Sequence, residues 1–417
     1  MLYKLFPFIT LILLTCTLPI IDWGIVAWIT LVPLFIFIRH KRTTTKQATL
    51  ITATIICLYI FVTLLPLISV NVWWWGNPLL YEYRHIILAL IFFFVSLYAG
   101  GLFGAFIGYT YHKTTHPLII ATLWGVLELA RLPISENFVW GMIGFSQHSL
   151  PTIFLSQYIG IVGVGFLIVL VNALIADTLR TKTKQNTTLL IITIIIITVV
   201  SIGIKNNTPT TPTLQSIPLS FKEEPTPDSW RDYLPRIQKE LEQEPDILLL
   251  PENSFSSIPT QTILHVFYTL SIQHPHTHIF LGIHQKENGI TFNSLAHIHQ
   301  GSIQDIYNKK QLLPLGEKDF FFQETYKKIT PGEKTTFSIH DTILTPLICS
   351  EISQSLPEVG DIILHASNES IFDSSLIAKQ IHIIATSRAI QHKTTIIHAT
   401  KGNSSYIIFP NGTMQSF

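Results

Sequence analysis

The chain has 417 residues, of which 48% are hydrophobic and only 13% are charged. In soluble globular proteins about a quarter of all residues are charged, so this composition excludes an ordinary soluble protein. The formal net charge of +1, with no basic patch among the aromatic residues, gives no reason to expect nucleic acid as a partner. Long apolar runs fill residues 1–204, whereas 219–417 have a globular composition. We therefore expect a membrane domain, a Thr- and Pro-rich linker at 205–218, and a soluble domain large enough to bury its own core.

The apolar runs are long enough to predict membrane-crossing helices. No small-residue cleavage site follows the first run, which favours an anchored helix over a signal peptide. We expect about seven spans, near residues 4–20, 23–38, 47–68, 86–111, 117–132, 153–178 and 188–204.

The distribution of basic residues predicts the orientation of these spans. Positively charged side chains gather after the second, fourth and sixth spans, at Arg39, Lys41, Arg42, Lys46, Lys113, Arg180, Lys182 and Lys184. By the positive-inside rule, these loops face the cytoplasm. An odd number of spans then places everything after residue 204 on the outer side of the membrane.

Two groups in the membrane half have both a structural and a functional interpretation. Trp73, Trp74 and Trp75 follow the third span, where an interfacial aromatic belt is the simpler interpretation and an entry site for lipid is the alternative. Glu128 and Arg131 lie three residues apart in an apolar helix and therefore share one face. They form either a structural ion pair or a headgroup-binding pair.

The second half alternates short apolar strands with helices, which predicts an α/β domain. Helices are expected near residues 231–243, 260–272 and 374–391. Strands are expected near 246–250, 277–283, 291–299, 302–307, 343–349, 361–366, 394–399 and 404–409.

Polar residues stand at or just after the ends of three predicted strands. Glu252 follows the first, Lys309 and Lys310 follow another, and Cys349 ends a third. Functional sites in α/β sheets gather at such strand ends. Cys349 is also the one cysteine of the soluble half, because Cys16 and Cys57 lie in apolar runs, where a buried structural role is favoured.

A carboxylate, an amine and a thiol can together catalyse acyl transfer. The thiolate attacks a carbonyl, a carboxylate of raised pKa takes and returns the proton, and an ammonium stabilises the oxyanion. Each residue alone has a simpler interpretation: Glu252 as a solvent-facing strand end, Lys309 as a surface charge, Cys349 as a packed thiol. Their joint occurrence favours the catalytic interpretation.

The order Glu252, Lys309, Cys349 resembles the Glu-Lys-Cys triad of the nitrilase superfamily. Within it, the chain resembles the apolipoprotein N-acyltransferases. Residues 307–317, YNKKQLLPLGE, are similar to that family's lysine motif, Tyr-x-Lys-x-x-Leu-Val-Pro-Phe-Gly-Glu. This similarity selects Lys309 rather than Lys310 as the catalytic lysine and adds Glu317 as a second carboxylate.

Three further segments carry the resemblance in the soluble half. Residues 348–352, ICSEI, are similar to the family's Ile-Cys-Tyr-Glu-Ile around the nucleophile, which includes Glu351. Pro251-Glu252 is similar to its Pro-Glu motif. Ser367-Asn368 is similar to its Ser-Asn pair after the following strand.

The membrane half resembles the same family, so the resemblance covers nearly the whole chain. Residues 124–131, WGVLELAR, with FVW at 138–140 and GFSQ at 144–147, are similar to the family's fifth-helix region, and residues 157–165 continue it. A soluble nitrilase would match only the second half. Trp140 in this region joins Glu128, Arg131 and Trp73–Trp75 as a candidate for lipid contact.

The resemblance implies a nitrilase-like αββα sandwich and a two-step reaction. Cys349 would take an acyl chain from a phospholipid as a thioester, and the amine of a diacylated apolipoprotein would then accept it. Glu252 would act as base and acid, and Lys309 would stabilise the oxyanion. Glu317 would orient or tune Glu252 and Lys309. Glu351 and Asn368 would support the site. The resemblance implies no cofactor and no metal, and it places the protein in the bacterial inner membrane with its catalytic domain on the periplasmic side.

The sequence departs from the family pattern near the thiol. Ser350 stands where the family usually has Tyr, and residues 367–372, SNESIF, lack the family's usual Trp. We expect these changes to affect the selectivity for lipid substrates more than the catalytic reaction itself. The chain ends at Phe417, so we also expect a C-terminus shorter than the family's, without its last strands and final membrane helix.

Other functions are weighed against acyl transfer. One is a membrane-anchored amidase or nitrilase that hydrolyses a C–N bond, and another is a catalytically impaired scaffold of the same fold. His274, His276, His278 and His284 could form a metal site, but they lack matching carboxylate or cysteine spacing, which favours a solvated strand edge.

Overall fold

The computed structural model describes residues 2–70, 81–114, 116–134, 138–208, 214–312, 317, 331–332, 336–354, 356, 359–372 and 374–417. Trp73, Trp74 and Trp75 lie outside the described residues. The chain divides into two compact units, and each is described by itself. The first comprises Met1–Ser69, Tyr83–Thr208 and Lys379–Gln391, and the second comprises Val70–Glu82, Pro209–Ala378 and His392–Phe417.

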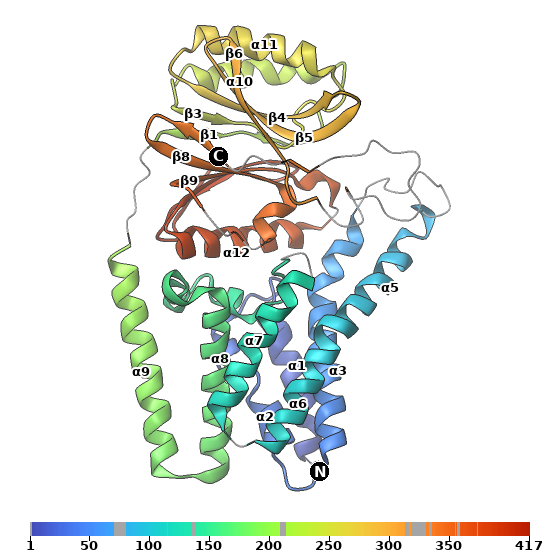
Figure 1. Cartoon of the computed structure of the whole chain (residues 1–417), viewed down its shortest axis with the longest axis vertical. Coiled ribbons are helices and arrows are strands. Elements are labelled where there is room, and N and C mark those ends of the chain that lie inside the picture. Colours follow the sequence, from blue (N-terminus) through green and yellow to red (C-terminus); the bar gives the residue numbers. More distant parts are fainter. Residues whose placement is uncertain are drawn as a thin grey trace. The chain divides into compact units, whose positions relative to one another are not determined.

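The first unit contains the apolar helices of the N-terminal half (Figure 1). Its helices are α1 (Phe6–Cys16), α2 (Val32–Ile38), α3 (Thr45–Leu64), α5 (Arg84–Ser96), α6 (Phe103–Lys113), α7 (Pro117–Ile134), α8 (Ser156–Thr181) and α9 (Lys184–Asn206). A π-helical turn, η4 (Leu97–Leu102), joins α5 to α6, and short 3-10 turns lie at η1 (Leu2–Leu5), η2 (Gly24–Trp28), η3 (Leu65–Ser69), η5 (Ile143–Gln147) and η6 (Pro151–Leu155).

Four helical segments of the described chain are long and apolar enough to cross a membrane. They are Thr45–Ser69, Arg84–Lys113, Pro151–Thr181 and Lys184–Asn206, each at a position predicted from the sequence. The first two predicted spans form shorter apolar helices, Tyr3–Cys16 and Gly24–Ile38. The fifth predicted span corresponds to α7.

Close packing between α3 and the η4–α6 helix depends on a stripe of glycines. Gly100, Gly104 and Gly108 recur every four residues, which places them on one helix face. A Cβ at Gly104 would lie 2.7 Å from the carbonyl oxygen of Thr52, and one at Gly108 would lie 2.5 Å from that of Ala48. Small residues spaced in this way let helix backbones approach closely in a membrane, where packing drives helix association.

The second unit is built on two β-sheets (Figure 1). The first sheet has the order β1-β3-β4-β5-β6, from β1 (Ser216–Pro218), β3 (Ile247–Leu249), β4 (His278–Glu287), β5 (Ile290–His299) and β6 (Ser302–Asn308). The second has the order β12-β11-β10-β9-β8-β7, with β2 (Ser220–Phe221) paired to β10 (Thr395–Lys401). Its other strands are β7 (Phe337–Ile339), β8 (Thr342–Ile348), β9 (Ile362–Asn368), β11 (Tyr406–Ile408) and β12 (Met414–Ser416).

Two hydrophobic clusters hold this unit together. One lies between the sheets, where Leu249 and Leu295 of the first pack with Ile348 and Leu364 of the second. The other joins the first sheet to the helices that cover it, α10 (Leu234–Leu241) and α11 (Thr260–Gln273). Burying each large aliphatic side chain contributes about 1.5–3 kcal/mol. The strands of both sheets are therefore apolar on their inward faces, and polar residues stand at their ends.

The predicted α/β domain is present, with differences at its borders. Part of the predicted linker, 205–218, is regular structure, because α9 extends through Asn206 and residues Ser216–Pro218 form β1. β1, β2, β7 and β12 were not predicted, because these short strands mix polar with apolar residues, unlike the equally short but wholly apolar β3 and β11. Helix α12 (Ser375–His392) connects β9 to β10, and its segment Lys379–Gln391 groups with the first unit.

Candidate active site

The predicted catalytic residues follow strands of both sheets. Glu252 lies in the turn after β3, and Lys309 directly follows β6, both in the first sheet. Cys349 directly follows β8 in the second sheet and opens the short helix η8 (Cys349–Ser353). The three side chains are close enough for their charges to shift one another's pKa values. The facing of the two sheets therefore brings the carboxylate and the ammonium to the thiol.

Glu252 is a buried carboxylate with one hydrogen-bond donor among the residues that the structure describes. Its Oε1 accepts a hydrogen bond of 2.7 Å from the side-chain amide of Asn293. Burial raises the pKa of Glu252 and the Glu317 carboxylate adds to the rise, while Lys309 acts in the opposite direction. A Cβ at Gly282 would lie 2.2 Å from the carbonyl oxygen of Pro251, so the turn that carries Glu252 requires glycine on β4.

Lys309 is fully buried but paired. Its Nζ lies 2.7 Å from Oε2 of Glu317, and its backbone N–H donates to the carbonyl oxygen of Asn293 at 2.8 Å. Burial alone lowers the pKa of Lys309, but the charges of Glu317, the Cys349 thiolate and Glu252 together raise it well above the usual lysine value. The side chain is therefore a permanent cation at the site.

Cys349 has a backbone conformation that few non-glycine residues adopt. Its φ is +53°, in the left-handed region, which costs of order 1–3 kcal/mol unless the surroundings compensate. The side chain is partly exposed. Burial, followed by the charge of Glu252, raises the pKa of the Cys349 thiol well above its usual value, although Lys309 lowers it. The thiol is therefore protonated at neutral pH and needs a base before it can attack.

Glu351 joins the end of β6 to the end of β8. Its Oε1 accepts hydrogen bonds from Tyr307 Oη at 2.8 Å, from Lys310 N–H at 2.9 Å and from Gln311 N–H at 3.1 Å. Its Oε2 accepts one from Ile348 N–H at 2.7 Å. These bonds tie the segment that carries Lys309 to the segment that carries Cys349.

Two polar residues of the site were not predicted from the sequence. Asn293, buried on β5, also donates to Oε1 of Glu317 at 3.1 Å and so contacts both carboxylates around Lys309. Lys401 is fully buried at the end of β10, where its Nζ pairs with Glu224 and donates to the carbonyl oxygen of Asn253 at 3.0 Å. The rule that selected Cys349, a polar residue at the end of an apolar strand, applies equally to Lys401. Asn293 lies within a strand, and only the pairing of that strand reveals its neighbours.

The described candidates for lipid contact are buried in the first unit. Glu128 and Arg131 lie on α7, and Oε1 of Glu128 accepts a hydrogen bond of 3.4 Å from Ile143 N–H. Trp140 is also buried, and its ring stacks on Phe138 at a centroid distance of 5.2 Å. Their contact with lipid stays a prediction.

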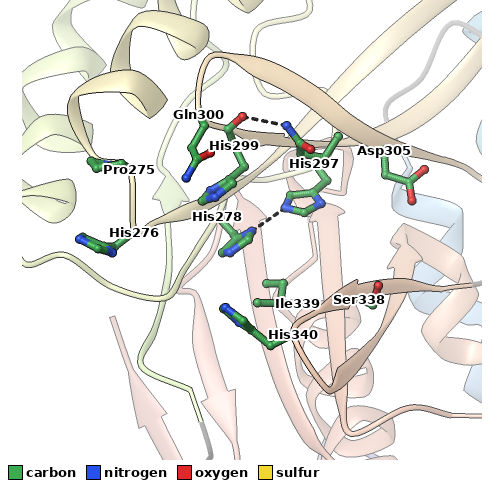
Figure 2. Close-up of a pocket in the computed structure, with 11 residues that line it drawn as sticks. Pro275, His276, His278, His297, His299, Gln300, Asp305, Ser338, Ile339 and His340 are labelled. Carbon is green, nitrogen blue, oxygen red and sulfur yellow. Dashed lines mark hydrogen bonds between the residues drawn. The ribbon is translucent and has the colours of Figure 1, made fainter.

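The histidines considered for a metal site fall into two groups. His276 and His278 line a cavity of about 450 Å³ together with His297, His299 and His340 (Figure 2), whereas His274 and His284 do not line it. Nδ1 of His278 lies 2.8 Å from Nε2 of His297, and the His278 ring stacks on His299 at 4.0 Å. Burial and the neighbouring imidazoles lower the pKa of His278 to about 4. Among the described residues, no group of three or more His, Cys, Asp or Glu side chains is arranged to hold a metal ion.

Both halves of the chain are similar to proteins named as apolipoprotein N-acyltransferases. Residues 12–174 match the model of the apolipoprotein N-acyltransferase N-terminal domain. The apolipoprotein N-acyltransferase of Shewanella oneidensis is 26% identical over 376 residues, which cover 79% of this chain and 71% of the relative. That of Haemophilus influenzae is 24% identical over 387 residues, or 81% of this chain and 74% of the relative.

A search of solved structures finds proteins similar to about half of the chain. A CN-hydrolase superfamily protein from Xanthomonas campestris covers 50% of this chain and 87% of its own, with 16% identity and a TM-score of 0.40.

Proposed function

We propose that this chain, which is related to the apolipoprotein N-acyltransferases, transfers an acyl chain from a phospholipid to the N-terminal amine of a diacylated lipoprotein through a thioester on Cys349. The observation that carries the proposal is the combination of two features in one chain. The membrane half matches the family model, and the soluble half places a thiol beside a carboxylate of raised pKa and a buried ammonium. The relatives are named as acyltransferases, which does not favour the hydrolase alternative.

In the first step, the Glu252 carboxylate takes the proton of the Cys349 thiol as sulfur attacks the ester carbonyl of the phospholipid. The raised pKa of Glu252 makes it a stronger base, which suits a thiol whose own pKa is raised. Lys309 holds the negative oxygen of the tetrahedral intermediate. The C–O bond then breaks, Glu252 returns the proton to the departing alkoxide, and a lysophospholipid leaves.

In the second step, the lipoprotein amine attacks the thioester carbonyl. Glu252 takes a proton from the amine, Lys309 again stabilises the oxyanion, and the C–S bond breaks to give an amide. The proton passes from Glu252 to the Cys349 sulfur, which restores the thiol. Glu317 keeps Lys309 charged and in place, since it pairs with Nζ at 2.7 Å.

The experiment uses the full-length protein with phosphatidylethanolamine and a diacylated lipopeptide. Mass spectrometry should detect an acyl group on the Cys349 peptide and a triacylated product. The Cys349→Ala variant should lose both signals, whereas Cys57→Ala, which changes a buried cysteine of α3, should keep them. A thioester without transfer to the amine would support hydrolysis instead, and transfer that survives in Cys349→Ala would refute the nucleophile assignment.

We further propose that the protein resides in the bacterial inner membrane with the second unit on the periplasmic side. The basic loops after the second, fourth and sixth predicted spans support this orientation. Alkaline phosphatase is active only where its disulfides can form, outside the cytoplasm. A fusion after Phe417 should therefore be active and a fusion after Lys182 inactive, and the opposite pattern would reverse the orientation.

A further inference from the structure

A chain of buried polar side chains begins at the carbonyl oxygen of Cys349. Nε2 of His365, on β9, lies 2.9 Å from the carbonyl oxygen of Cys349. Nδ1 of His365 lies 2.8 Å from Nδ1 of His398, on β10. Nε2 of His398 lies 3.1 Å from Oε1 of Glu369, and Asn403 Nδ2 donates to Oε2 of Glu369 at 3.0 Å.

Strand register explains why these side chains meet. On β9, His365 pairs with Leu347 of β8 and with His398 of β10. The rings of His365 and His398 therefore project from neighbouring positions of adjacent strands. Glu369 begins the short helix η9 (Glu369–Ile371) directly after β9. Both imidazoles are fully buried and Glu369 is nearly so, which makes unsatisfied polar atoms costly here.

Counting hydrogens along this chain assigns its donors. A carbonyl oxygen can only accept, so Nε2 of His365 carries a hydrogen. The contact between the two Nδ1 atoms needs a second hydrogen, so two neutral imidazoles satisfy both contacts. Nε2 of His398 faces Oε1 of Glu369 at 3.1 Å but makes no hydrogen bond among the described residues.

The second hydrogen belongs to His398. Burial and the neighbouring His398 lower the pKa of His365 well below its usual value, so His365 stays neutral with its hydrogen on Nε2. His398 then donates from Nδ1 to Nδ1 of His365. This arrangement fixes the His365 tautomer, because the opposite tautomer would turn a lone pair toward the Cys349 carbonyl.

We propose that His365, His398 and Glu369 form a positioning relay that holds the nucleophile backbone in its left-handed conformation. The relay touches neither substrate nor reacting atoms, and it acts through the Cys349 peptide group. Strand β9 thereby contacts Cys349 at its carbonyl oxygen through His365. The inference rests on the proposed role of Cys349 as nucleophile.

The first test compares two substitutions of His365. His365→Gln keeps an amide hydrogen at about the reach of Nε2, whereas His365→Leu removes it. A displacement of about 1 Å at a nucleophile can cost about 10²-fold in rate. We expect His365→Leu to lower kcat for acyl transfer by about 10²-fold with KM little changed, and His365→Gln to recover most of that loss. Equal losses in both variants, or none in His365→Leu, would overturn the proposal.

A second measurement separates the relay from the acyl-transfer function. The rate of alkylation of Cys349 by iodoacetamide, followed on its peptide by mass spectrometry, needs no lipid substrate. It should fall in His365→Leu and recover in His365→Gln even if the acyl donor has been misassigned. An unchanged alkylation rate in His365→Leu would contradict the relay whatever the enzyme's substrate.

Substitutions at His398 cover the case in which His365→Leu does not fold. His398→Asn keeps a donor near the position of Nδ1, and His398→Leu removes it while leaving His365 in place. We expect His398→Leu to slow both alkylation and transfer and His398→Asn to slow them less. His299→Gln, in the histidine cavity of Figure 2, is the matched control and should change neither rate. A loss in His299→Gln as large as that in His398→Leu would refute the specificity of the relay.

Discussion

Glu252 and Glu351 are both buried carboxylates near Cys349, but they differ in the hydrogen bonds that they accept. Glu351 receives one from Tyr307 and three from backbone N–H groups. Within the described part of the chain, Glu252 receives one from Asn293, and the nearby Glu317 carboxylate opposes its charge. A carboxylate surrounded by donors holds loops together, whereas one with few donors is ready to accept a proton. These surroundings suit Glu351 to a supporting role and Glu252 to proton transfer.

The largest expected effect is on catalysis at Glu252. Glu252→Gln should lower the rate of acyl transfer by about 10⁴-fold, as found when a residue that acts as a unit with a nucleophile is removed. The same variant should unfold at an equal or higher temperature. Because the pKa of Glu252 is raised in the folded state, its ionised form costs stability above that pKa, and the neutral amide removes this cost.

Kinetics and thermal unfolding of Glu252→Gln, measured beside Glu242→Gln at an exposed position, check this prediction. A variant that kept a tenth of the activity, or that lost stability, would show that Glu252 is a structural carboxylate like Glu351.

Glu351→Gln should lower the stability of the fold, which is the opposite of the effect expected for Glu252→Gln. All four contacts of Glu351 come from donors, so an amide nitrogen in place of one oxygen would face a donor. Leaving a buried donor unpaired costs about 1–3 kcal/mol, and we expect a loss of this size in the free energy of unfolding. Denaturant titration measures it, with the exposed Glu287→Gln as control. Unchanged stability would contradict the supporting role.

The smallest expected effect is on the pH profile. Acyl transfer requires the ionised form of Glu252, so the rate should rise with pH through a midpoint above the usual glutamate pKa of about 4.3. The positive charge of Lys401 lowers the pKa of Glu252. Lys401→Met should therefore move the midpoint to higher pH. A midpoint that stayed in place or moved down would show that Lys401 does not act on Glu252.

The sequence predicted the strands that carry the site because their apolar runs are long and bounded by polar residues. β3, β4, β5, β6, β8, β9 and β10 all lie where they were expected. The resemblance to the apolipoprotein N-acyltransferases is confirmed by the family model and by the curated relatives. Chain order also placed Glu252, Lys309 and Cys349 at strand ends, although their roles stay predictions.

The contacts within the site depend on pairing between distant segments. Asn293 faces Glu252 because β4 pairs antiparallel to β5, and His365 faces His398 because β9 pairs parallel to β10. A sequence lists such residues one by one, without the register that makes them neighbours.

Local chemistry therefore determined which segments are long and apolar enough to cross a membrane, which form strands and where a thiol, a carboxylate and an ammonium stand. Those features depend on hydrophobic periodicity and on residue type, which are properties of short stretches of chain. Only the tertiary structure decided how the buried charges are paired. The four donors to Glu351 and, among the described residues, the single donor to Glu252 depend on strand pairing and on the facing of two sheets. The contact of His365 with His398 depends on the register of β9 with β10.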